Sequence, residues 1–211
     1  MSNIIKNKFR QFALKKRQRK FRKLNIVPEK VSILASNCWG GQLYHDANMM
    51  FLSPTINLTF EPNDFLTFVD KIGEIQTASI IEKNDNKPYP VGLITYSDGT
   101  QITIYFVHYK TFKEAKDVFL KRSKRICKNI VAILMVNKLE AGVVEKFKMI
   151  PYKKKCIYGT TNCDVRNDKD FIKFELITKS KKDILSFKSY LTGERLIDSV
   201  DFDYYRFVFA D

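Results

Sequence analysis

The chain has 211 residues, of which 45% are hydrophobic and 28% charged, and its formal net charge is +14. This is the composition of a soluble globular protein, and the length suffices for one sizeable core or for two small subdomains that share an interface. The longest aliphatic run, Ile130–Val136, has seven residues and is too short to cross a bilayer, and the charged N-terminus shows no secretory signal.

The positive charge is concentrated at one end of the chain. Residues 1–30 hold eleven Lys or Arg against a single acid, a net charge of +10, whereas residues 31–211 have a net charge of +4. A domain that binds nucleic acid usually places its basic side chains on the folded body. The distribution therefore argues against nucleic acid as the partner and predicts a basic arm over residues 1–27, followed by a body over residues 28–211.

The cysteine and histidine pattern gives no sign of a metal site. The two histidines complete no zinc pattern, and no Cys-x-x-Cys pair occurs among Cys38, Cys127, Cys156 and Cys163. The sequence identifies no cofactor and indicates no oligomeric state. It is typical of a cytoplasmic protein with reduced thiols.

Residues 3–23 contain no Gly or Pro and predict a helix, on which Ile5, Phe9, Phe12 and Lys16 follow helical spacing. One interpretation is a solvated basic arm, partly disordered. A second is an amphipathic helix on anionic lipid at the inner face of the membrane, where the apolar stripe supplies burial and the bases supply attraction. The third, nucleic-acid binding, is the least favoured. Pro28 then separates the arm from the body.

The stretch from Val31 to Thr55 is the one around which the rest of the body is expected to be organised. An apolar run from Val31 to Ala35 predicts a buried strand. Small and polar residues follow it, and the stretch closes on Ser53-Pro54-Thr55. Open α/β sheets place their ligands just past strand ends, so this stretch is predicted to hold the functional site.

The next elements are marked by local turn and cap signals. A helix is expected to begin at Pro62 and to stop near Gly73, and a short strand is expected over residues 78–81. Asp98-Gly99, between β-rich runs at 91–96 and 101–108, predicts a hairpin. Thr111 and Glu114 form a capping box for a helix that runs to about residue 128.

The second half of the chain alternates between strand and helix patterns. Residues 130–136 are typical of the middle strand of a parallel sheet. The other expected elements are a helix at 139–147, strands at 153–158 and 171–177, a helix at 183–191, and an aromatic tail at 200–209 that packs on the body. The predicted class is α/β, a mixed sheet with a parallel portion, in two small subdomains centred on residues 31–100 and 101–160.

Ordered motifs through the body form one pattern: Asn37-Cys38-Trp39-Gly40-Gly41, Tyr44, Ser53-Pro54-Thr55, Asp64-Phe65, Tyr89-Pro90-Val91-Gly92, Phe106-Val107-His108-Tyr109, and Arg122-x-x-Arg125-Ile126 with Asn129-Ile130. The pattern resembles an uncharacterised bacterial domain-of-unknown-function family whose members are commonly described as exopolysaccharide or capsular polysaccharide biosynthesis proteins. The resemblance covers about residues 31–160 and implies an α/β fold with two small subdomains. Phe119 stands where many relatives have Trp, which indicates a packing position.

The resemblance also implies a role in surface-glycan assembly at the cytoplasmic face of the membrane. The expected reaction is glycosyl or acyl transfer to or from an anionic sugar precursor, either a nucleotide-sugar or a sugar phosphate. The alternative is a non-catalytic carbohydrate-binding or assembly protein of the same pathway.

Three residues are candidates for catalysis. His108, at the end of a predicted strand, is the first candidate for a general base, and His45 is the second. Cys38 is a candidate nucleophile, because a helix N-terminus would stabilise its thiolate. Each has a structural alternative, namely a hydrogen-bonded histidine or a small buried cysteine.

Eight further residues are candidates for ligand binding. Gly40 and Gly41 could let backbone N–H groups approach a phosphate, or could permit close packing of a helix on the sheet. Trp39 could stack on a sugar ring or belong to the core. Arg122 and Arg125 could hold a diphosphate or complement a helix C-terminus. Asn37, Ser53 and Thr55 complete the set.

Overall fold

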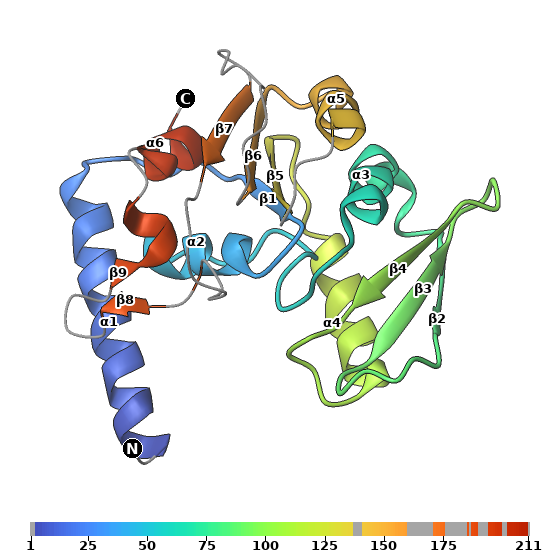
Figure 1. Ribbon diagram of the computed structural model, residues 1–211, viewed down its shortest axis with the longest axis horizontal. Helices are drawn as coiled ribbons and strands as arrows, with labels where there is room; N and C mark the ends of the chain where they lie inside the picture. Colours follow the sequence, from blue (N-terminus) through green and yellow to red (C-terminus); the bar gives the residue numbers. More distant parts are fainter. Residues whose placement is uncertain are drawn as a thin grey trace.

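The computed structural model describes residues 3–136, 141–159, 171–175, 185, 187–189, 194–199 and 202–210. Within them the chain forms a four-stranded sheet, a three-stranded sheet and a two-stranded ribbon, with helices on both sides of the four-stranded sheet (Figure 1). The predicted α/β class is confirmed.

The larger sheet is parallel throughout. Its strands lie in the order β1 (Ser32–Ala35), β5 (Ile130–Val136), β6 (Lys154–Gly159) and β7 (Phe171–Glu175). The inner position predicted for Ile130–Val136 is confirmed. β1 is an outer strand that pairs with a segment almost one hundred residues further along the chain.

The smaller sheet is antiparallel and contains the predicted hairpin. β2 (Ser79–Glu82), β3 (Val91–Thr95) and β4 (Gln101–Tyr105) lie in sequence order, and Gly99 has the positive φ of 83° that the turn requires. β4 ends at Tyr105, three residues before His108, because the backbone turns back there through hydrogen bonds from Val107 and Tyr109. The prediction that His108 lies at the end of a strand is therefore wrong. The division into two subdomains at residue 100 stays a prediction, although β4 belongs with β2 and β3.

The helices start where cap signals place them. α3 (Pro62–Asp70) begins with its proline, and Thr111 caps α4 (Phe112–Ser123) by accepting a hydrogen bond from the Glu114 N–H at 3.3 Å. α4 ends five residues earlier than expected. In its last turn the Ser123 hydroxyl donates to the Phe119 carbonyl at 2.9 Å, and tighter turn bonds follow it. The remaining elements are α2 (Trp39–Ala47), α5 (Ala141–Met149), α6 (Tyr204–Phe209) and the 3-10 helices η1 (Ile72–Glu74) and η2 (Leu196–Ser199).

One expected helix is wrong. Within residues 183–191, Phe187–Ser189 form the strand β8, which pairs antiparallel with β9 (Glu194–Arg195). A neighbouring strand competes for the same backbone groups that a helix would use, and helical spacing alone does not reveal it. The aromatic tail does pack on the body as predicted, since Tyr204, Tyr205, Val208 and Phe209 are buried.

Two hydrophobic cores lie on opposite faces of the parallel sheet. Successive side chains of β5 alternate between them, so Val131 and Ile133 join one core while Ala132 and Leu134 join the other. The second core contains Phe60, Phe68 and Phe119 and extends to the antiparallel sheet. Burial on both faces is what a parallel sheet requires.

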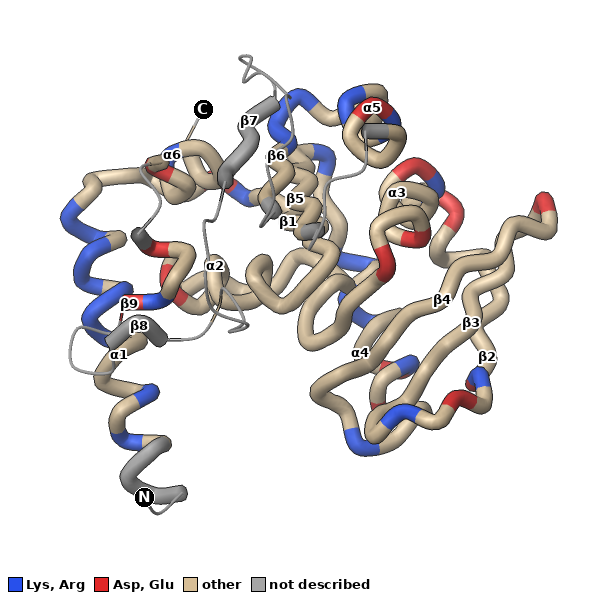
Figure 2. The backbone as a smooth tube through the Cα atoms, in the orientation of Figure 1, with Lys and Arg blue, Asp and Glu red and all other residues tan. Residues whose placement is uncertain are grey.

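The N-terminal arm is an ordered helix of the body. α1 (Asn3–Lys23) confirms the helix predicted over residues 3–23, and Ala13 and Phe21 are buried on one of its faces. Phe12, which belongs to the apolar stripe expected to face lipid, is 48% exposed, and the face that packs on the body lies beside it. Lys and Arg line much of the helix (Figure 2), and the lipid contact expected of the apolar stripe stays a prediction. None of the helices in the described ranges is both long and apolar enough to span a membrane.

Candidate anion-binding site

The motif residues that follow β1 complete the hydrogen bonding of that strand. The Tyr44 hydroxyl accepts from the Ile33 N–H at 2.9 Å and donates to the Val31 carbonyl at 2.7 Å. The Thr55 hydroxyl accepts from the Ala35 N–H at 3.0 Å and donates to the Ile33 carbonyl at 3.3 Å. An outer strand that is buried would otherwise leave these backbone groups unpaired.

Ser53 supports the same arrangement. Its hydroxyl lies 3.0 Å from the Thr55 hydroxyl and accepts from the Thr55 N–H at 3.1 Å, and neither side chain has exposed surface. The rigid Ser53-Pro54-Thr55 turn therefore seals the edge of β1. Ligand binding by Ser53 and Thr55 is not supported by this geometry, because both hydroxyls are already engaged inside the protein.

The Gly-Gly pair and the tryptophan also serve packing. A Cβ on Gly40 would lie 3.1 Å from the Ala35 Cβ, and one on Gly41 would lie 3.2 Å from the Ile56 Cγ2, so α2 sits too close to its neighbours for larger side chains. The Trp39 ring is fully buried. Stacking of Trp39 on a sugar is therefore wrong, because its ring is enclosed by Tyr158 and Tyr204 at centroid distances of 5.0 and 5.5 Å.

Asn37 organises the turn between β1 and α2. Its Oδ1 accepts from the Trp39 N–H at 3.1 Å and from the Tyr158 hydroxyl at 3.2 Å. The next residue, Cys38, directly precedes α2, and its Sγ lies 3.9 Å from the Leu58 carbonyl oxygen. Asn37 is 6% exposed, so its side chain is used mainly to shape this turn.

The two predicted arginines do meet the central stretch, but through its backbone. Arg122 Nη1 donates to the Tyr109 hydroxyl at 3.0 Å and to the Ile56 carbonyl at 3.4 Å, and Arg125 Nη1 donates to the Phe51 carbonyl at 3.4 Å. The Arg122 guanidinium also lies 5.0 Å from the centroid of the Phe51 ring. These contacts fasten the loop that follows α2 to the end of α4.

The predicted histidines lie at the margin of this cluster. The exposed His45 ring is edge-on to Phe51, with centroids 5.1 Å apart. His108 is exposed in the turn after β4, and it is the neighbouring Tyr109 that bonds Arg122. Burial raises the pKa of Tyr109, although Arg122 acts in the opposite direction, so its hydroxyl stays protonated at neutral pH.

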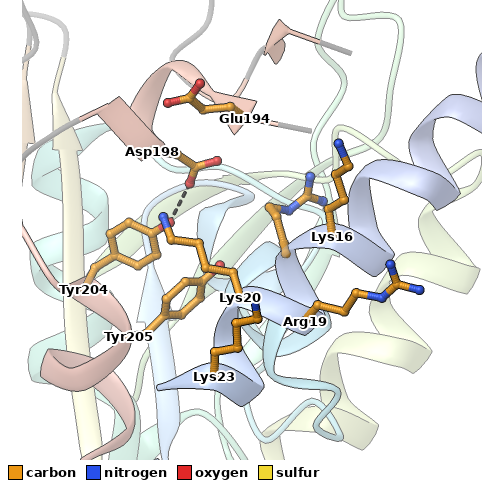
Figure 3. A pocket seen from close by; sticks show the side chains of 9 residues that line it. Lys16, Arg19, Lys20, Lys23, Glu194, Asp198, Tyr204 and Tyr205 are labelled. Atoms are coloured by element: carbon orange, nitrogen blue, oxygen red, sulfur yellow. Dashed lines mark hydrogen bonds between the residues drawn. The ribbon is translucent and has the colours of Figure 1, made fainter. Parts of the chain in front are cut away.

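A cavity of about 410 Å³ lies elsewhere, between α1 and the C-terminal segment (Figure 3). This volume is within the range of small-molecule sites. α1 lines one side with cations, and Glu194, Asp198, Tyr204 and Tyr205 line the other (Figure 3). The cations, at helical spacings of three and four residues, are Lys16, Arg17, Arg19, Lys20 and Lys23. We call this cavity the α1 pocket.

The α1 pocket adjoins a buried ionic network built around Arg195. This side chain has no exposed surface, and its Nη2 lies 2.8 Å from a carboxylate oxygen of Asp46 and 2.8 Å from one of Asp198. Its Nη1 donates to the Gln42 side chain at 2.7 Å. A buried guanidinium is tolerated only with such partners, so the network joins β9 to α2 and η2.

Two tyrosines and a second arginine complete the network. Tyr204 donates to Asp198 at 2.5 Å, Tyr205 donates to Asp46 at 2.9 Å, and Arg17 Nε donates to Asp46 at 2.8 Å. Burial would raise the pKa of Asp198, but the hydrogen bonds and charge of Arg195 hold that pKa below its ordinary value.

The phenols respond in the opposite sense. Burial, followed by the nearby carboxylates, raises the pKa of both Tyr204 and Tyr205, so they remain hydrogen-bond donors at neutral pH. The two arginines of the network therefore face two aspartates, and their charges balance. Within the described part of the chain, Arg19, Lys20 and Lys23 form no ion pair, so positive charge in the α1 pocket is left over for an anion.

Sequence reasoning placed these cations in an arm and missed Arg195 and Asp198 altogether. The spacing of Lys16, Lys20 and Lys23 was visible, but the surface opposite them comes from the other end of the chain. The spacing of Arg195 and Asp198, three residues apart and beside the buried Ile197, is the sequence feature that could have indicated an ion pair there. No group of three or more potential metal-ligating side chains occurs in the residues that the structure describes, and Cys163 lies outside them.

The fold and the α1 pocket define an α/β protein with a cavity that basic side chains line on one side and acids and tyrosines on the other. A model of a domain of unknown function, DUF1919, matches residues 5–208, and the chain belongs to this family. A Haemophilus influenzae protein, named only "Uncharacterized protein", is 28% identical over 198 residues, which cover 90% of this chain and 92% of that protein.

Proposed function

We propose that the protein binds the phosphate group of an anionic sugar precursor, a sugar phosphate or a nucleotide-sugar, in the α1 pocket. The observation that supports this is the set of uncompensated cations Arg19, Lys20 and Lys23 around one cavity. Lysine and arginine bind phosphate by charge-assisted hydrogen bonds. The pathway, exopolysaccharide or capsular polysaccharide biosynthesis, is supported by the family resemblance.

The chemical step within that pathway has two candidates. Glycosyl or acyl transfer is what the resemblance favours, with His108, Cys38 and His45 as the candidate catalytic residues. Non-catalytic binding of the precursor is what the pocket geometry favours, because its tyrosine hydroxyls and Asp198 are already engaged in the buried network. If His108→Ala and Cys38→Ser both leave polysaccharide production intact in folded protein, transfer by these residues is refuted.

Attachment to an anionic lipid surface is part of the proposal. Lys8, Arg10 and Lys15 are exposed on α1, and so is half of Phe12. Basic side chains near a bilayer contribute about 1 kcal/mol each of attraction to anionic lipid. Docking of this kind would hold the α1 pocket near the inner membrane face, where lipid-linked sugar phosphates reside. Nucleic acid is the less favoured partner, because the body carries little net charge.

The binding proposal is tested by calorimetric titration of the full chain with a sugar 1-phosphate and a nucleotide-sugar. Lys20→Ala and Lys23→Ala should each weaken binding by about tenfold, the value of one charge-assisted hydrogen bond. Lys121→Ala, an exposed lysine on α4, is the matched control. The proposal fails if neither ligand binds, or if the α1 variants bind like the control.

The pathway is tested in cells. A chain with Lys20→Glu and Lys23→Glu, expressed in place of the natural protein at equal abundance, should reduce surface polysaccharide. Unchanged polysaccharide would refute a role of the α1 pocket in glycan assembly.

A further inference from the structure

The two sides of the α1 pocket differ in chemistry. The α1 side supplies only cations, whereas the opposite side supplies carboxylates and phenols (Figure 3). A simple anion would be served by cations all round, and a carboxylate facing it would be repulsive. The presence of acids therefore points to a ligand with a second, hydrogen-bond-donating part.

The two carboxylates on this side are not equivalent. Asp198 is saturated, because Oδ1 accepts from Tyr204 and Arg195, and Oδ2 accepts from the backbone and side chain of Arg195. Its side chain is 6% exposed. Glu194 is half-buried and lies across the cavity from the helix (Figure 3). A carboxylate has about four acceptor positions, so Glu194 can accept hydrogen bonds from a ligand while keeping other contacts.

The backbone around Glu194 holds it in place. β9 pairs with β8, and the next residue, Arg195, is anchored by the buried network. Rigid support of this kind is what a specificity-determining side chain requires. The rest of this side includes Tyr204 and Tyr205, which are 6% and 3% exposed, so Glu194 is the more accessible polar group there.

We infer that the α1 pocket takes a sugar phosphate, with the phosphate on α1 and the sugar hydroxyls read by Glu194. The inference rests on the proposed function and narrows it to the sugar phosphate, which needs only one phosphate position on α1 and one hydroxyl-accepting group opposite it. Glu194 is thus the residue that distinguishes a phosphorylated sugar from inorganic phosphate.

The test compares glucose 1-phosphate, inorganic phosphate and uridine diphosphate by calorimetry on the full chain. Glucose 1-phosphate should bind about tenfold more tightly than inorganic phosphate, and in Glu194→Ala the two should bind with equal affinity. Glu194→Gln keeps a neutral acceptor and should retain an intermediate ratio, because a charged acceptor forms bonds roughly twice as strong. Glu82→Ala, an exposed glutamate on β2, should change nothing.

The outcomes separate the inference from the proposed function. If phosphate and glucose 1-phosphate bind equally in the natural chain, or if Glu194→Ala leaves the ratio unchanged, the inference is wrong while the phosphate site survives. Tighter binding of uridine diphosphate than of glucose 1-phosphate also overturns the inference. If none of the three binds, the proposed function itself fails.

Discussion

Replacement of Asp46 by alanine should be among the most destabilising single changes in this chain. Asp46 accepts from Arg17, Tyr205 and Arg195, and its side chain has no exposed surface. Removal leaves Arg195 buried with half of its compensating charge and leaves the Tyr205 hydroxyl without its acceptor. Breaking a buried pair by removing one partner costs about 3–5 kcal/mol.

The assay is urea denaturation followed by circular dichroism, with thermal melting as a second measure. For a chain of this size, a loss of about 1 kcal/mol in the free energy of unfolding lowers the melting temperature by about 2–4 °C. The melting temperature of Asp46→Ala should therefore be about 10 °C lower than that of the natural chain. Glu145→Ala is the matched control. Its partner Lys148 lies 3.1 Å away on the surface of α5, with side chains 69% and 33% exposed, and such pairs contribute about 0–1 kcal/mol.

A double-mutant cycle with Arg195→Met completes the design. If the two charges stabilise each other, the double variant should be more stable than the sum of the single changes predicts. A stabilising role of the buried Asp46–Arg195 pair is refuted if Asp46→Ala lowers the free energy of unfolding no more than Glu145→Ala does. It is also refuted if the cycle shows no coupling energy between the two residues.

Three further results follow from the packing and hydrogen bonds. Gly40→Ala should lower the free energy of unfolding by about 1–3 kcal/mol, because the new Cβ would lie 3.1 Å from the Ala35 Cβ. Gly142→Ala on α5, where a Cβ has nothing within 4 Å, should raise it by about 0.4–1 kcal/mol. Equal effects of the two changes in urea denaturation would contradict the packing explanation. Tyr44→Phe should lower the free energy of unfolding by about 2 kcal/mol, because it leaves the Ile33 N–H and the Val31 carbonyl at the edge of β1 unpaired. An unchanged free energy would show that water replaces the hydroxyl. The folded pKa of Asp198 is depressed, so the stabilisation from its ionised form is present above the unfolded pKa of about 3.9 and is lost as the pH falls through the folded value. Asp198→Asn should therefore flatten the fall in the free energy of unfolding between about pH 5 and pH 2. An unchanged slope would contradict this.

Features set by chemistry a few residues apart were predictable. Asp98-Gly99 makes a turn because Gly99 adopts a positive φ, and Thr111 caps a helix because its hydroxyl reaches an N–H three residues away. The strand Ile130–Val136 was predictable because its unbroken apolar run can only be satisfied by two covered faces.

Features that depend on distant partners were not predictable. Thr55 was a predicted ligand-binding residue and the motif residue Tyr44 had no predicted role, because sequence alone does not show that β1 is an outer strand with an unpaired edge. The α1 pocket was missed for a related reason, since Lys20 and Glu194 line one cavity only after the C-terminal segment folds against α1.

The integration of α1 into the body changes how its contact with lipid must be tested. Removal of residues 1–24 would delete Phe21, whose ring is edge-on to Tyr205 at 5.3 Å and to Phe209 at 5.4 Å, and would also take Arg17 from the buried Asp46. Loss of a buried aromatic side chain alone costs about 3–5 kcal/mol. The truncated chain should therefore unfold at lower urea, and loss of vesicle binding would not identify the anchor.

Point changes on the exposed part of α1 avoid this difficulty. Lys8→Gln, Arg10→Gln and Lys15→Gln remove charge from exposed positions without touching Ala13 or Phe21. The triple variant should keep its stability and lose most of its binding to anionic vesicles, since each base contributes about 1 kcal/mol near the surface. Undiminished vesicle binding would refute α1 as the anchor, whereas a truncated chain as stable as the full one would refute its place in the core.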